Sequence, residues 1–335
     1  MKTFSNLVMI LLCLLFLQGT AAAVLGVLDD VPAQDLVFPF ICAKDDPSGM
    51  NTYWAIAETA GNIVAFPGLA GVQNVFVRDR DGVLVMDYSS TFTPLDVVTG
   101  NCQTLIQGMS PSMKLQLELI ISGEAYYAGY ITTQEEVAFG SNHYVGWVYL
   151  IDSASSFKTG KVGPVAGFKP FQAEGGVNDN NLGEDAGIYP IRAKTVFPRY
   201  FILNANSRNW WIVLTAKQPN TLTTINSLKL AGLICDEEEH CVSQSIPINH
   251  RLEFIDVSAF LPALPSPLVY PKAGFAKLDV LLTTTILTSP PIVTTPDYSF
   301  FMWSYQRECY LAKGKTCPLS WTAMHPVDRF YQYPQ

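Results

Sequence analysis

Apolar residues in this chain fall into short runs separated by Gly, Pro, Asn and Asp. The runs are rich in Val, Ile, Thr, Tyr, Phe and Trp, which favour β-strands. The predicted strands are Thr52–Ala57, Asn74–Arg78, Val83–Asp87, Leu115–Ile121, Tyr126–Thr132, Tyr144–Asp152, Tyr200–Leu203, Trp210–Thr215, Leu228–Cys235, Leu252–Val257, Ala276–Thr283 and Ser299–Gln306. Helical periodicity is weak, and its best candidate, Met109–Ile121, has Pro111 near its start. The pattern predicts an all-β protein built from antiparallel β-sandwiches.

The two halves of the chain resemble each other. Six segments recur in the same order at a spacing of about 150–160 residues, which is the signature of an internal repeat. The matched pairs are Val37–Pro39 with Val196–Pro198, Asn51–Ala57 with Asn209–Thr215, Arg78–Gly82 with Asp236–His240, Leu95–Val97 with Ile255–Val257, Tyr130–Thr133 with Leu281–Thr284, and Tyr144–Tyr149 with Tyr298–Tyr305. The order predicts an internal duplication, with two tandem sandwich domains.

The repeat sets the expected domain boundaries. Domain 1 is predicted at residues 30–155 and domain 2 at residues 195–310. Residues 156–194 are rich in Gly and small polar residues, which suits a linker or long loop. Residues 311–335 are predicted to form a C-terminal tail tied back by a disulfide.

The N-terminal segment has the organisation of a signal peptide. In residues 1–23, Lys2 is followed by the apolar run Leu7–Leu17 and then by Thr20–Ala23, a stretch of small residues. The apolar run is shorter than a membrane-spanning helix requires, and no later stretch is long enough. We therefore expect an exported protein, periplasmic or extracellular, with no transmembrane segment after the signal is removed.

Six cysteines follow the predicted signal, and an even number in an exported chain favours disulfides. Cys235 and Cys241 bracket an acidic turn, and Cys309 and Cys317 bracket a basic one. Pairing by proximity leaves Cys42 with Cys102. In this scheme the Cys235–Cys241 bridge closes in domain 2 the turn that Asp81-Gly82 closes in domain 1.

Composition excludes several classes of protein. The 335 residues are 49% hydrophobic and only 15% charged, which argues against disorder and against coiled coils. The formal charge of −8 makes nucleic acid an improbable partner.

Catalytic motifs are weak. The sequence lacks a Gly-x-Ser-x-Gly elbow, and Ser155–Lys158 fits Ser-x-x-Lys without the accompanying motifs. Asp96 and Asp256 occupy matching repeat positions and leave open a hydrolase with an unrecognised carboxylate site. We expect a protein without catalytic machinery and without a cofactor.

Metal-binding patterns are also weak. The run containing Asp179, Asn181, Glu184 and Asp185 offers oxygen ligands suited to calcium but lacks the spacing of an EF-hand loop. His240, beside three glutamates, is more simply explained by a solvated acidic turn. No metal site is predicted beyond these candidates.

Aromatic pairs are the better functional candidates. Neighbouring residues in a strand point to opposite faces, so Tyr53-Trp54 and Trp210-Trp211 each place one ring inward and one outward. An outward ring can stack on a sugar or anchor a protein partner. The alternative is that the core covers one ring and a neighbouring domain covers the other. The expected function is binding, adhesion or a role in envelope structure, with a carbohydrate-binding module as the first rival.

Overall fold

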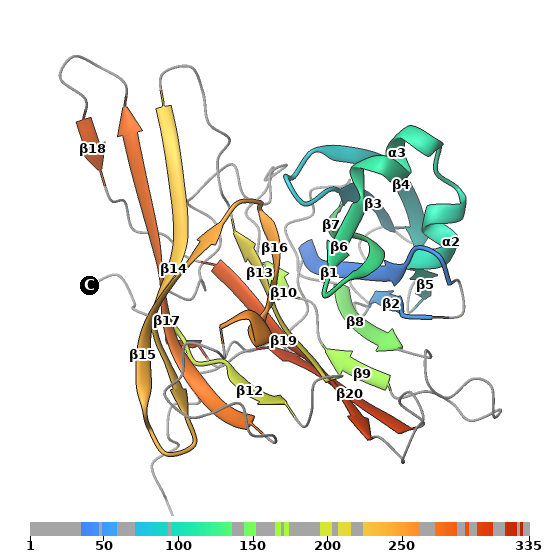
Figure 1. Ribbon diagram of the computed structural model, residues 1–335. Helices are drawn as coiled ribbons and strands as arrows, with labels where there is room; N and C mark the ends of the chain where they lie inside the picture. Colours follow the sequence, from blue (N-terminus) through green and yellow to red (C-terminus); the bar gives the residue numbers. More distant parts are fainter. Residues whose placement is uncertain are drawn as a thin grey trace, which may run out of the picture.

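The computed structural model describes residues 35–46, 49–58, 71–92, 96–135, 144–151, 165–168, 171–173, 195–202, 207–215, 224–260, 272–286, 292–294, 300–310, 319–326 and 329–330. The predicted signal peptide and the calcium candidates lie outside these ranges. Within them the protein consists mainly of β-strands in antiparallel sheets, which confirms the all-β prediction. Figure 1 shows the N-terminal half on the right and the C-terminal half on the left.

The strands of the N-terminal half form one ten-stranded hydrogen-bonded sheet, which we describe as two parts because only one residue pair joins them. We call the first part the N-inner sheet; its pairing order is β4-β3-β7-β1-β10, with β6 also paired to β7. We call the second part the N-outer sheet, with the order β5-β2-β8-β9; the single residue pair, Cys42 with Asn51, joins the two parts through β1 and β2. The strands are β1 (Asp35–Ala43), β2 (Asn51–Glu58), β3 (Gly71–Arg78), β4 (Leu84–Phe92), β5 (Val97–Asn101), β6 (Glu118–Ile121), β7 (Glu124–Glu135), β8 (Tyr144–Ile151), β9 (Val165–Phe168) and β10 (Phe171–Ala173).

The C-terminal half contains two sheets. The C-inner sheet has the order β16-β13-β19-β20, and the C-outer sheet has the order β15-β14-β17-β11-β21, with β12 and β18 also paired to β17. The strands are β11 (Thr195–Val196), β12 (Arg199–Ile202), β13 (Arg208–Thr215), β14 (Thr224–Asp236), β15 (Cys241–Ile248), β16 (Leu252–Asp256), β17 (Lys272–Ile286), β18 (Ile292–Thr294), β19 (Phe300–Tyr310), β20 (Leu319–Pro326) and β21 (Arg329–Phe330).

Some of these strands lie outside the predicted domain cores. Strands β9 and β10 fall in the predicted linker and pair with β8 and β1. Strands β20 and β21 fall in the predicted C-terminal tail and pair with β19 and β11. Each half therefore uses chain beyond the predicted boundaries to widen its sheets.

One strand in each half is followed directly by a short helix, β5 by α2 (Cys102–Gln107) and β16 by the 3₁₀ helix η3 (Val257–Ala259). Asn101 caps α2 by accepting a hydrogen bond from the Thr104 amide, and Asp256 caps η3 through the Ser258 amide. The helix candidate Met109–Ile121 is instead divided. It contains α3 (Pro111–Gln116), with Pro at the first helical position, and then β6.

The sheets stack in the order N-outer, N-inner, C-inner, C-outer. Phe38 of the N-inner sheet packs against Trp54 of the N-outer sheet, and Tyr126 of the N-inner sheet packs against Trp210 of the C-inner sheet. Trp210, Ile212 and Leu214 of β13 join the core of the N-terminal half, whereas Trp211 and Val213 join the core beneath the C-outer sheet. Strand β1 is likewise buried on both sides. This alternation explains why both strands are continuously apolar rather than half polar.

Two hairpin tips of the N-terminal half hold the halves together. At the β6–β7 tip, Ser122 donates to Asp256 and accepts from Trp210 Nε1, and Glu124 forms an ion pair with Arg208 at 3.6 Å. At the β3–β4 tip, the Leu252 amide donates to the Arg80 carbonyl oxygen at 2.9 Å. The tips thereby fix the position of the C-inner sheet against the N-terminal half.

Two of the predicted disulfides are present. Cys42 on β1 is bonded to Cys102 at the start of α2, and Cys235 is bonded to Cys241 across the β14–β15 turn. The described residues leave out Cys317, so the third predicted bridge lies outside them.

Candidate functional site

The predicted aromatic residues have three different environments. Tyr53 points outward from β2 and is 39% exposed, while its neighbour Trp54 points into the core and is 4% exposed. Trp210 and Trp211 are both fully buried, on opposite sides of β13. Only Tyr53 therefore presents a ring that a ligand can reach directly.

Trp210 is covered by the N-terminal half. Its ring lies 5.6 Å from the ring of Tyr126 on β7 in an edge-on arrangement, and 4.9 Å from the ring of Tyr305 on β19. Its indole N–H donates to Ser122 at 3.1 Å. Burial between two halves of one chain, with the polar atom satisfied, is the environment of a structural tryptophan.

Tyr53 belongs to a larger aromatic group. It lies directly opposite Tyr149 on β8, and Tyr149 is 40% exposed. Trp147 lies two residues earlier on β8, on the same side of the sheet, and is half-buried. We call the outward side of the N-outer sheet around Tyr53, Trp147 and Tyr149 the aromatic face.

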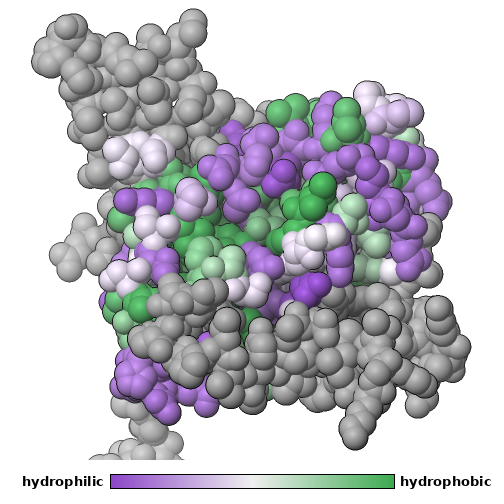
Figure 2. All heavy atoms as spheres, viewed as in Figure 1, coloured by the Kyte–Doolittle hydropathy of each residue, from purple (hydrophilic) through white to green (hydrophobic). Residues whose placement is uncertain are grey.

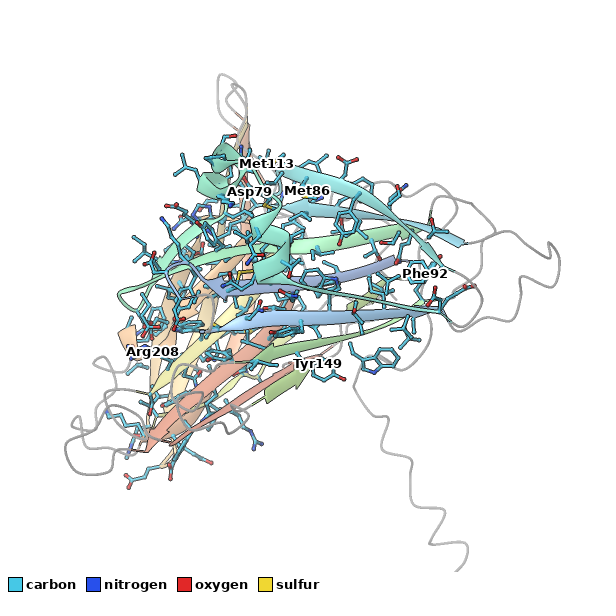
Figure 3. All side chains as sticks on the ribbon, turned by 90° about the vertical axis from the view of Figure 1, so that its right-hand side faces the viewer. Asp79, Met86, Phe92, Met113, Tyr149 and Arg208 are labelled. Carbon is cyan, nitrogen blue, oxygen red and sulfur yellow. A yellow bond between two sulfur atoms is a disulfide. The ribbon has the colours of Figure 1, made fainter. Side chains whose placement is uncertain are left out.

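A groove of about 670 Å³ adjoins this face. It opens between β4 and β5, which are the edge strands of the two N-terminal sheets and do not pair with each other. Its lining residues are Tyr53, Trp54, Ala55, Met86, Tyr88, Thr99, Gly100, Asn101, Thr104, Leu105, Gly108 and Tyr149. None of these side chains is charged, so the groove suits a neutral or apolar surface. Figure 3, which looks onto the N-terminal half, shows Met86 and Tyr149 in this half.

Gly100 determines how the groove reaches the core. A Cβ atom at this position would lie 2.5 Å from Trp54 Cε2 and 2.7 Å from Trp54 Nε1. The indole edge therefore occupies the space that a side chain on β5 would fill. Any residue larger than glycine at position 100 would displace Trp54.

Several polar atoms in the groove are available to a ligand. Among the residues that the structure describes, the hydroxyls of Tyr53, Tyr88 and Tyr149 have no hydrogen-bond partner. Burial raises the pKa of Tyr88, so its hydroxyl remains protonated and able to donate. By contrast, Asn101 is already used, because its side-chain oxygen caps α2.

Sequence reasoning missed Trp147, Tyr149 and Tyr88 as site residues. The alternation along β8 places Trp147 and Tyr149 on the same side of the sheet, and Tyr53 of the neighbouring strand β2 lies on that side too. Identifying that side required the pairing of β8 with β2, which no local pattern specifies. Tyr88 comes from the other sheet and could be found only through the fold.

The two carboxylates considered for hydrolysis lie on different sheets. Asp256 accepts hydrogen bonds from Ser122 and Ser258 and caps η3. The backbone oxygen of Asp96, next to β5, accepts from the Glu58 amide at 3.1 Å. Burial, together with the nearby Asp96 charge, raises the pKa of Glu58. Both aspartates therefore have roles at strand ends.

No arrangement in the described part of the chain brings three or more His, Cys, Asp and Glu side chains into position for a metal ion. His240 lies 3.2 Å from Asp236 and 3.6 Å from Glu238, within the acidic β14–β15 turn. The calcium candidates Asp179, Asn181, Glu184 and Asp185 and the segment Ser155–Lys158 lie outside the described residues.

None of the helices in the described ranges combines the length and the apolar character needed to cross a membrane. Figure 2 shows one side of the molecule, on which hydrophilic residues predominate over the N-terminal half and hydrophobic residues gather toward the centre of the view. No protein-family model matches this chain, and no curated protein sequence matches it.

Proposed function

We propose that this chain is an exported, non-catalytic binding or adhesion protein whose binding surface is the aromatic face with its groove. The single observation that carries the proposal is the pair of facing rings, Tyr53 and Tyr149, which are 39% and 40% exposed beside an uncharged groove of about 670 Å³. Exposed aromatic rings next to a concave apolar surface favour recognition.

Export rests on two independent features. Residues 1–23 have the organisation of a signal peptide, and the chain carries two disulfides of a kind that persists in oxidising compartments. Intact-mass analysis of the exported protein tests this. We expect the mass to lack residues 1–23, and a full-length mass with free thiols would contradict export.

The proposal extends to the internal duplication. The pairing orders β5-β2-β8-β9 and β16-β13-β19-β20 correspond strand by strand, as do β4-β3-β7-β1 and β15-β14-β17-β11. The turns also correspond: Asp79 and Asp236 each accept from the amides two and four residues later. Such agreement in order and in turn chemistry supports two copies of one sandwich unit.

Corresponding positions follow from the registers. Tyr53 pairs with Tyr149 and with Asn101, the cap of α2, whereas Trp210 pairs with Tyr305 and with Asp256, the cap of η3. Trp147 lies two residues before Tyr149, and Trp303 lies two residues before Tyr305. The aromatic face therefore has a counterpart in the C-inner sheet, formed by Trp210, Trp303 and Tyr305, which we call the covered face.

A neutral carbohydrate is a candidate ligand for the groove, which would make the chain a carbohydrate-binding module. The groove offers aromatic rings for stacking and phenolic hydroxyls without partners in the described part of the chain, and its lining has no charged side chain. This combination suits a hydroxyl-rich, uncharged molecule.

A binding comparison tests the proposed function. Three proteins are applied to a glycan array and to a surface that carries the immobilised wild-type protein: the wild type, Tyr53→Ala/Tyr149→Ala and the control Leu115→Ala/Ile120→Ala. The control removes two exposed apolar side chains outside the groove lining. We expect binding to at least one surface, weakened at least about tenfold by the tyrosine variant alone, as for hot-spot rings. Binding to neither surface, or equal binding by all three proteins, would contradict the proposal.

A further inference from the structure

We propose that the partner of the aromatic face is a second copy of this chain, docked through the outward side of its C-outer sheet. This inference rests on the proposed binding function and on the proposed duplication. The partner is inferred from the contact between the C-inner and N-inner sheets within one chain.

The internal contact supplies the precedent. The covered face of the C-inner sheet lies against the outward side of the N-inner sheet, where Tyr126 packs edge-on against Trp210. On the same side of β7, the Tyr130 hydroxyl is hydrogen-bonded to Arg251 and the tyrosine is 2% exposed. One unit thus uses an N-inner-type sheet to cover the aromatic cluster of the next unit.

The C-outer sheet corresponds to the N-inner sheet and carries a ring, Phe275, at the position of Tyr130, with Lys277 at the position of the buried Thr132. Arg78 pairs with Tyr130, and its counterpart Cys235, which likewise precedes the turn aspartate, pairs with Phe275. Two residues earlier, Phe76 corresponds to Leu233. Phe275 and Leu233 lie on neighbouring strands of the C-outer sheet and are 38% and 41% exposed.

Glycine contacts support this correspondence. A Cβ atom at Gly129 would lie 2.3 Å from the Arg78 carbonyl oxygen, and one at Gly274 would lie 2.1 Å from the Cys235 carbonyl oxygen. Both positions therefore require glycine for the same reason, close approach of the neighbouring strand. The residue after each glycine is Tyr130 or Phe275, so the two rings occupy equivalent places on their sheets.

The two free faces are at opposite ends of the stack. The aromatic face is on the N-outer sheet, and Phe275 and Leu233 are on the C-outer sheet. In Figure 1 these sheets lie at the right and the left of the molecule. A contact between two different faces is heterologous, and unless its rotation closes a ring it continues from molecule to molecule. The expected assembly is a head-to-tail series.

Charge limits the strength of this contact. Within the chain, the β3–β4 tip pairs Asp81 with His250 at 2.8 Å. In the contact between copies, the corresponding tip carries Glu237, Glu238 and Glu239, and the residue that corresponds to Arg251 is Asp96. Like charges at an interface oppose association, and salt screens them. The same face also carries the exposed Lys277, directly opposite Leu233, so its charges are of both signs. Association is therefore expected to be weaker than the internal contact.

Sedimentation of complementary variants tests the proposal. Sedimentation is measured from micromolar to near-millimolar concentration for four proteins: the mature chain, Tyr53→Ala/Tyr149→Ala, Leu233→Ser/Phe275→Ser and the control Leu115→Ala/Ile120→Ala. We expect a concentration-dependent series of oligomers for the wild type and the control. Each face variant should associate at least about tenfold more weakly, as expected from loss of two interface rings or anchors. Because each variant keeps one intact face, an equimolar mixture of the two should form dimers and nothing larger.

The other outcomes separate this inference from the proposed function. A wild-type chain that stays monomeric but binds glycans through Tyr53 and Tyr149 overturns the inference and leaves the proposed function intact. Association that the face variants do not weaken, with no glycan binding, overturns both. Unfolding transitions of each variant show whether a loss of association reflects misfolding; if a variant is unfolded, Tyr149→Ser and Phe275→Ser alone provide the test.

Discussion

The aromatic face and the covered face have nearly the same residues in the same register, yet one is open and the other is buried. Tyr53 and Tyr149 are 39% and 40% exposed, whereas Trp210 and Tyr305, which pair with each other in the same way, are fully buried. The sheets behind them pair in the same order. The difference arises from the neighbour: the N-inner sheet covers one cluster, and no described element covers the other to the same extent. The same aromatic positions can therefore serve stability in one half and recognition in the other.

The largest expected effect separates these two roles. Trp210→Ala should lower the free energy of unfolding by about 3–5 kcal/mol, because it removes a fully buried indole from between the two halves. Tyr53→Ala should cost less than about 1.5 kcal/mol, because much of the ring already contacts water. Denaturant unfolding of both variants measures the difference. Equal losses would mean that the two faces have the same role.

The disulfides provide the next comparison. Cys42–Cys102 joins residues separated by 60 positions and Cys235–Cys241 joins residues separated by 6. Chain entropy predicts losses of about 4 and about 2 kcal/mol when each pair is replaced by alanine. Cys42→Ile/Cys102→Val, which installs the buried pair Ile202 and Val257 that the proposed duplication matches to these cysteines, should recover part of the larger loss. Urea unfolding tests this order, and a larger loss at Cys235–Cys241 would contradict it.

The two hairpin turns differ at the residue with positive φ. Gly82 has a φ of 88°, and its counterpart Glu239 has a φ of 63°. Gly82→Ala should destabilise the protein by about 1–3 kcal/mol, since the new Cβ would lie 2.5 Å from Arg251 Cδ and in an unfavourable backbone conformation. Glu239→Gly should stabilise it by up to about 1 kcal/mol. Thermal unfolding of both variants measures these changes, and the same sign for both would refute the explanation.

The smallest effect concerns the turn aspartates. Burial raises the pKa of Asp79, although amide hydrogen bonds partly offset it. At Asp236 burial acts in the same direction, but hydrogen bonds from the His240 and Glu238 amides and from the His240 ring outweigh it and lower the pKa.

Linkage gives opposite signs for the two groups. The stability due to Asp79 is fully present below its unfolded pKa and is lost as pH rises through its raised value. The stability due to Asp236 is present above its unfolded pKa and is lost as pH falls through its lowered value. The stability difference between wild type and Asp79→Asn should therefore fall with increasing pH, and that for Asp236→Asn should rise. Unfolding measured between pH 3 and pH 7, a range about the ordinary Asp pKa, tests the signs.

Strands, turns and the Cys235–Cys241 bridge could be predicted from the sequence because each depends on local chemistry, whereas Cys42–Cys102 followed only as the remaining pair. β-branched and aromatic runs marked most strands, and the acidic turn between Cys235 and Cys241 is short enough for its pairing to follow from proximity. The sequence also placed Tyr53 outward and Trp54 inward as one of two alternatives, which alternation along a strand allows.

Register could not be predicted in the same way. The sequence match aligned Tyr53 with Trp211, but strand pairing makes Trp210 its counterpart, one residue away. It also aligned Asp96 with Asp256, whereas pairing makes Asn101 the counterpart of Asp256. A one-residue slip exchanges the two faces of a strand, so the fate of each ring depended on contacts between distant segments.

The most direct test of the central claim is hydroxyl-radical footprinting of the aromatic residues as a function of protein concentration. In dilute protein, Tyr53 and Tyr149 should be modified readily, while Trp210 and Tyr305 should be protected. As copies associate, Tyr53, Tyr149 and Phe275 should become protected together, and the exposed Leu115 should stay unchanged. Unchanged modification of Tyr53 and Tyr149 while the chain associates would contradict the account.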